Sequence, residues 1–142
     1  MAAFNKYNIF SKNVAEKVHN LASDALKVAL TNTAPNAATH AVLADITEIG
    51  AGNGYTAGGN AAAQSSSAQS GGVYTLALND PATWTANGGT MGPFRYAVLY
   101  NATPTSPLKP LIGYWDYGSS ITLNDGETFT ADLNNTATLT LT

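Results

Sequence analysis

No cysteine occurs in the 142-residue sequence, and this absence excludes disulfide bonds and thiolate metal sites. Long hydrophobic runs are also missing. No stretch approaches the about 20 apolar residues of a membrane span, and the first residues lack the apolar run of a signal peptide. We therefore expect no membrane partner and synthesis in a cytoplasm. A chain of this length without cross-links must bury a core, and we expect one domain over residues 1–142.

Charge is the second shortage. Charged residues make up 11% of the chain, against about 25% in ordinary soluble domains. The net charge of −3 and a pI near 5.0 argue against nucleic acid as a partner. A surface poor in charge is less protected against association, which suits a subunit of an assembly. A small secreted domain with a Thr/Asn-rich surface is the alternative interpretation.

Groups that carry out chemistry are equally scarce. The two histidines, His19 and His40, lie outside any metal-binding motif, and no Gly-x-Ser-x-Gly nucleophile motif is present. Asp125, Glu127 and Asp132 lack the spacing of a calcium-binding loop. The sequence therefore predicts a protein that is not an enzyme, with no catalytic residue, no cofactor and no metal ion.

The stretch from 92 to 129 is the richest in large aromatic residues, and the rest of the chain is expected to pack against it. Its alternating apolar residues are typical of half-buried strands. Three prolines between 101 and 110 interrupt the pairing, Gly118 ends a strand, and Asp125-Gly126 is hairpin-turn chemistry. The strands predicted here cover 94–100, 111–117, 121–123 and 127–133.

Further alternating segments extend this pattern along the chain, at 26–30, 73–78, 82–86 and 136–142. A short helix is expected after an N-cap at Asn13, because Val14, Val18 and Leu21 form one apolar stripe. We therefore predict a mainly β protein. Its architecture is an antiparallel β-sandwich or partly closed barrel of seven to nine strands, with one short N-terminal α-helix.

Two segments without clear periodicity are the predicted interfaces. Residues 1–12 read as an N-terminal arm, and residues 50–72 form a Gly/Ala/Ser-rich loop that a neighbouring subunit would order. We expect deletion of residues 1–10 to abolish binding to a particle without unfolding the domain. The candidate interface residues are Phe4, Tyr7, Ile9, Phe10, Tyr55, Gly58 and Gly59.

Five segments of the chain are distinctive. They are LKVALTNTAP (26–35), LADITEI (43–49), GNGYTAGG (52–59), GPFRYAVLYN (92–101) and LIGYWDYGSSITLNDGETFT (111–130). Together they resemble a family of small virion proteins of tailed bacteriophages. The resemblance implies a structural virion component made in the host bacterial cytoplasm. Such proteins commonly decorate the capsid exterior as cement proteins, often as trimers, so the implied partners are the major capsid protein and copies of this chain.

Two alternatives remain open on the sequence. A tail-tip or fibre-associated phage protein fits the same resemblance. A carbohydrate-binding module also fits, because Trp84, Tyr114, Trp115 and Tyr117 could form an aromatic platform for a surface glycan. Exposure of those rings separates the hypotheses, since a sugar platform needs coplanar exposed rings whereas an assembly subunit buries them.

Overall fold

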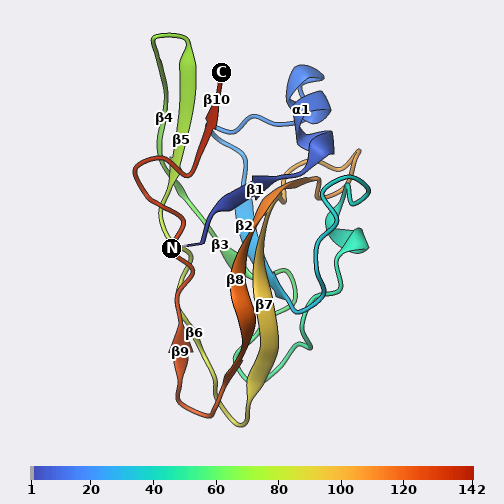
Figure 1. The fold of residues 1–142 in the computed structure, drawn as a ribbon, viewed down its shortest axis with the longest axis vertical. Coiled ribbons are helices and arrows are strands. Elements are labelled where there is room, and N and C mark those ends of the chain that lie inside the picture. The colour runs from blue at the N-terminus through green and yellow to red at the C-terminus, as the bar shows by residue number, and fades with distance from the viewer. Residues whose placement is uncertain (1) are drawn as a thin grey trace.

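The computed structural model describes residues 2–142, which form ten strands, one α-helix and one 3₁₀ helix (Figure 1). All ten strands pair antiparallel within three sheets, in the orders β1-β8-β7-β2-β3, β10-β5-β4 and β6-β9. The elements are β1 (Phe4–Lys6), α1 (Asn8–Ala15), β2 (Leu26–Thr31), the 3₁₀ helix η1 (Leu43–Asp45), β3 (Asn60–Ala61), β4 (Gln64–Ser70), β5 (Val73–Leu78), β6 (Trp84–Thr85), β7 (Met91–Asn101), β8 (Leu111–Leu123), β9 (Thr128–Phe129) and β10 (Leu139–Leu141).

The five-stranded sheet lies in the middle of the molecule. The two smaller sheets cover one of its faces, and the loop that carries η1 lies toward the other side (Figure 1). Helix α1 lies near one end of the sheet, and its Phe10 joins the apolar cluster shared with the small sheets. The sheets are separate and open, so the fold is a mainly β sandwich with one short N-terminal helix, as predicted, and not a closed barrel. The five-stranded sheet is therefore covered on both faces.

Two apolar clusters hold this arrangement together. The larger one joins the central sheet to the small sheets, and includes Leu76 of β5, Leu139 of β10 and Trp115 of β8. The smaller one lies on the opposite face, where Val98 and Tyr100 meet Leu43 and Ile46 around η1, with Tyr7 and Leu111. Strand β7 contributes to both clusters, and this explains why it is apolar at nearly every position instead of alternating.

One short N-terminal helix is present, as predicted, but its position is wrong: α1 covers Asn8–Ala15 and shares only Val14 and Ala15 with the helix expected after Asn13. Helix α1 ends in a Schellman motif: Lys17 has φ 64°, its amide donates to the Val14 carbonyl, and the Val18 amide donates to the Asn13 carbonyl. Asn13 is buried inside the helix and does not cap it. The stripe of Val14, Val18 and Leu21 runs past the end of the helix because the left-handed turn at Lys17 redirects the chain.

Gly118 does not end a strand, contrary to the sequence prediction. Strand β8 runs without a break from Leu111 to Leu123, and Gly118 has φ 87° within a large bulge. Asp116 lies opposite Tyr96 and Ile121 lies opposite Phe94, so four residues of β8 face one residue of β7. The irregularity also moves Phe94 into the larger cluster, away from the face that Val98 and Tyr100 share.

The last predicted strands are much shorter than expected. Only Thr128–Phe129 of the segment 127–133 forms a strand, and it pairs with β6 and not with β8. At the end of the chain β10 covers Leu139–Leu141 and pairs with β5. Both short strands place apolar residues against the larger cluster. Burial of these side chains therefore fixes the position of the strands more than their few backbone hydrogen bonds do.

Candidate interaction surfaces

The predicted N-terminal arm is built into the fold. Strand β1 pairs with β8, with Phe4 opposite Trp115, and the two rings meet edge to face with centroids 5.3 Å apart. The side chains of Tyr7 and Phe10 are fully buried, and Ile9 is partly buried against the smaller cluster. These residues stabilise the monomer, so Tyr7 and Phe10 present no surface to a partner.

Gly113 shows how closely β1 approaches β8. A Cβ at this position would overlap the ring of Phe4 and approach the Asn5 carbonyl oxygen. Deletion of residues 1–10 would remove β1 and two fully buried aromatic rings. The expectation that this deletion leaves the fold intact is therefore wrong. A deletion that unfolds the domain cannot separate a loss of binding from a loss of folding.

Tyr55, the first candidate residue of the 50–72 segment, is a core residue. Its hydroxyl donates to Glu48 Oε1 at 2.6 Å and accepts from the Leu30 amide at 3.1 Å. Burial, followed by the hydrogen bond with Glu48, raises the pKa of the Tyr55 phenol well above its ordinary value. A phenol that stays neutral and doubly hydrogen-bonded holds this segment to β2.

Gly58 and Gly59 are likewise buried, and the contacts around them explain why glycine is needed. The Gly58 amide donates to Glu48 Oε1 at 2.7 Å, and its carbonyl accepts from the Tyr100 hydroxyl at 2.6 Å. Burial raises the pKa of Tyr100 to about 12. Gly59 has φ 72°, and a Cβ there would overlap the Val28 carbonyl oxygen. These glycines allow close backbone packing, and both are buried within the monomer.

The second half of the same segment forms a strand where the sequence predicts a loop. Strand β4 pairs with β5 through the Gly71-Gly72 turn, with Ser70 opposite Val73. Both turn glycines have positive φ, 57° and 84°, as a two-residue type I′ hairpin requires. The Gly-Gly pair before an alternating strand is the sequence signal for this hairpin, and the absence of large apolar residues in β4 concealed it.

Strand β4 is the outer edge of its sheet, and in Figure 1 the β4–β5 hairpin stands out from the body of the molecule. Every residue from Ser65 to Ser70 is exposed. A bulge at Ser65 interrupts the pairing, and the Gln64 side chain is held by the carbonyls of Leu21 and Asp24. Beyond that anchor, Ser66–Ser70 is a regular strand, here called the β4 edge. It contains neither charge nor proline, the usual protection of an exposed edge.

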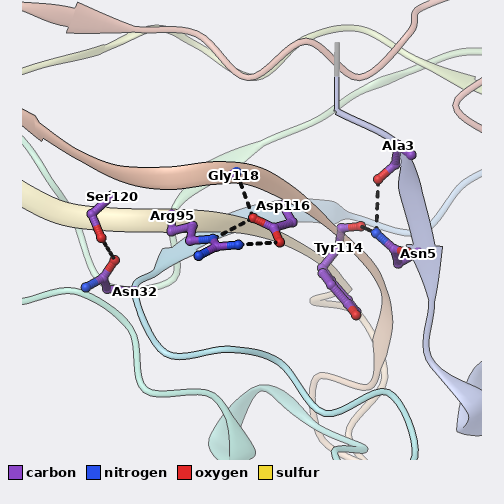
Figure 2. Close-up of polar contacts among 8 residues, drawn as sticks. All are labelled: Ala3, Asn5, Asn32, Arg95, Tyr114, Asp116, Gly118 and Ser120. Carbon is purple, nitrogen blue, oxygen red and sulfur yellow. Dashed lines mark hydrogen bonds and ion pairs between the residues drawn. The ribbon is translucent and has the colours of Figure 1, made fainter.

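A second open edge lies on β8, beyond the three residues that β1 covers. Figure 2 shows that charged and polar contacts surround it. Arg95 donates to both carboxylate oxygens of Asp116, at 2.7 and 3.0 Å, and the Gly118 amide donates to Asp116 Oδ1 at 2.8 Å. These bonds lower the pKa of Asp116, with the Arg95 bond as the largest cause. Ser120 also donates to Asn32. The bulge and the ion pair make this edge a poor template for pairing.

A partly buried cluster of three polar side chains, Asn101, His19 and Asp24, joins the loop after α1 to the central sheet. The Asn101 side chain donates to His19 Nδ1 at 3.0 Å and to Asp24 Oδ2 at 2.6 Å. Burial lowers the pKa of His19 to about 4, against a smaller opposing effect of Asp24. Neutral His19 can accept this bond, so the group secures the loop. It lies beside a shallow depression of about 450 Å³ between α1 and the hairpin, lined by Val14, Leu21, Ser67, Tyr74 and Leu141 among others.

The aromatic platform considered for sugar binding is not exposed. Trp84 and Trp115 are each only 1% exposed, and both belong to the larger apolar cluster. Tyr114 and Tyr117 are partly buried, and the Tyr117 ring lies edge-on to Phe129. By the criterion of coplanar exposed rings, these four residues fit core packing and not a sugar platform.

Among residues 2–142, no group of three or more His, Asp or Glu side chains is placed to hold a metal ion. In the same part of the chain, no helix is long and apolar enough to cross a membrane. Comparison of the chain with protein-family models, curated proteins and solved structures found no match. The β4 edge is therefore the feature on which a functional proposal can be built.

Proposed function

We propose that this protein is a non-enzymatic structural component of a tailed-phage virion, and that it decorates the capsid exterior as a cement protein. The observation that carries the association role is the β4 edge, an uncharged strand on a protruding hairpin with open backbone hydrogen-bonding groups. The phage setting rests on the resemblance of the five sequence segments. The proposed partners are the major capsid protein and further copies of this chain.

The surface composition supports association through backbone groups instead of an apolar patch. Within residues 2–142, Leu108 is the only large hydrophobic side chain that is well exposed, at 58%. Few charges are available for ion pairs, since charged residues are 11% of the chain. An open strand edge supplies directional hydrogen bonds without either of these features. A cement protein acts by such association alone, since added buried area across a subunit junction opposes its separation.

Cosedimentation with phage particles tests this proposal. Purified protein is mixed with emptied, undecorated heads of a tailed phage that carries this gene, and in parallel with isolated tails. We expect saturable, stoichiometric binding to heads and a higher temperature of head disruption in the decorated particles. Binding to tails alone would transfer the protein to the tail tip or fibre. Binding to neither particle would overturn the virion role.

A further inference from the structure

We propose that two copies of this chain associate by pairing their β4 edges antiparallel about a two-fold axis at Ala68. The two three-stranded sheets then join into one continuous sheet, with β4 of each copy at its centre. This inference deepens the proposed function and rests on it, because it names the surface through which copies of the subunit meet.

The turn of the hairpin fixes which backbone groups are free. In a two-residue hairpin the residues that flank the turn form a hydrogen-bonded pair, and the pairs alternate along the strands. Ser70, Ala68 and Ser66 therefore direct their amides and carbonyls toward β5. Ser67 and Gln69 direct theirs outward, where no strand of residues 2–142 pairs with them. The β4 edge thus offers two residues with both backbone groups open.

A two-fold axis at Ala68 satisfies these groups. It places Ser67 of each copy opposite Gln69 of the other, so that each pair exchanges both of its backbone hydrogen bonds. Ser66 then lies opposite Ser70, within the regular run beyond the Ser65 bulge. Ala68 meets its own copy in a pair without hydrogen bonds, where Cα atoms are about 4.5 Å apart. A small side chain fits this close approach.

Charge distribution favours a second copy over a charged partner. Between Glu48 and Arg95 only Asp80 carries a charge, and its carboxylate accepts a hydrogen bond from the Leu133 amide at 2.8 Å. A two-fold axis brings identical residues together, so any charge on the axis would face a like charge. An uncharged strand avoids this repulsion, and it also offers nothing that would attract a charged protein.

The other free edges are less suited to pairing. Strand β10, at the far side of the same sheet, is three residues long. The open part of β8 is distorted by its bulge and carries the Arg95–Asp116 pair. Because the β4 edge is only five residues long, we expect weak pairing, with a dissociation constant in about the micromolar range or above. Such pairing becomes effective where subunits are concentrated.

The absence of cysteine makes a direct test possible, because any introduced thiol is unique. We would compare Ala68→Cys with Ser119→Cys, which is also an exposed position and lies in the β8 bulge. The close Cα approach on the axis suits a disulfide. Under mild oxidation of the purified full chain, we expect Ala68→Cys to form covalent dimers at least about 10-fold faster than Ser119→Cys, which corresponds to 1.4 kcal/mol. Equal rates would overturn the inference.

Sedimentation equilibrium of cysteine-free protein supplies a second measurement. We expect wild-type chain to show concentration-dependent dimerisation, Ala68→Lys to weaken it at least about 10-fold, and Ser119→Lys to leave it unchanged. Ala68 is exposed, so the lysine variant should unfold at the wild-type temperature. A wild-type chain that stays monomeric at millimolar concentration, or one that forms trimers which Ala68→Lys does not affect, would overturn β4 pairing.

These assays contain no phage particle, so the two proposals can fail separately. Dimers that cross-link through Ala68→Cys but bind no heads would overturn the cement role and leave the pairing established. Head binding by a chain whose Ala68→Cys variant cross-links no faster than Ser119→Cys would overturn the pairing and leave the cement role in place.

Discussion

The β7–β8 pair and the β4–β5 pair are both antiparallel strand pairs within larger sheets, yet they differ in almost every other respect. β7 and β8 are covered on both faces over much of their length, and they contribute Phe94, Tyr100 and Trp115 to the two apolar clusters. β4 has no buried residue at all, and β5 buries only its second half. The first pair is the scaffold of the fold, whereas the second is attached along one strand.

The difference separates the stabilising core of the molecule from the strand edge that we propose for association. Large side chains in a close-packed interior supply most of the folding free energy. A hairpin of small polar residues supplies little, but its exposed edge is open to another strand. The edges differ in the same way, since the β8 edge carries a bulge and an ion pair while Ser66–Ser70 carries neither.

The largest effect should come from truncating the scaffold. We expect Trp115→Ala to lower the free energy of unfolding by about 3–5 kcal/mol, because the side chain is 1% exposed and leaves a cavity. The matched change on the other pair, Ser66→Ala, should alter it by less than about 0.5 kcal/mol. Urea denaturation of both variants measures the contrast. Similar losses would mean that the hairpin is also part of the stabilising core.

An intermediate effect is expected from the glycines with positive φ. Gly118 in the β8 bulge and Gly72 in the hairpin turn have φ of 87° and 84°, and a Cβ at either position meets no atom within 4 Å. Alanine at either position should therefore lower the free energy of unfolding by about 1–2 kcal/mol through backbone strain alone, although the surroundings differ. Thermal unfolding of the two variants tests this equality. A far larger loss for Gly118→Ala would show that the bulge is coupled to the packing of β8.

The smallest effect should come from the ion pair beside the β8 edge. The folded-state pKa of Asp116 lies below its ordinary value of 3.8, so the pair contributes stability above about pH 4. That contribution is lost as the pH falls through the lower folded-state pKa. Asp116→Asn should therefore have a slightly lower free energy of unfolding than wild type at pH 7. This difference, the stability gap, should narrow in acid and at high salt. Urea denaturation from pH 2 to 7 measures the gap, and a gap that stays constant down to pH 2 would contradict this account.

Several strands could be predicted because their apolar pattern matches their surroundings. The segment 73–78 coincides with β5, 26–30 lies within β2, and 94–100 lies within β7. The proline-containing loop and the Asn124–Gly126 turn were also located correctly. In each case local conformational preferences and burial favour the same structure.

Other features depend on residues far away in the chain. Tyr7 and Phe10 look like an exposed apolar arm until β1 pairs with β8, more than 100 residues later. Gly58 and Gly59 look like loop residues until Tyr100 and Val28 are placed against them. β4 has no apolar periodicity because it is exposed, and only its pairing with β5 makes it a strand. The burial of five candidate interface residues, Tyr7, Phe10, Tyr55, Gly58 and Gly59, could not be predicted from the sequence for the same reason.

The sequence by itself determined a cysteine-free, charge-poor, mainly β chain, since composition and period-two alternation express local preferences that persist in any fold. Only the tertiary structure decided which strands are scaffold and which edge is open. Burial and strand order depend on contacts between distant segments, and the same serine-rich stretch is a loop or an exposed edge according to whether a neighbouring strand pairs with it.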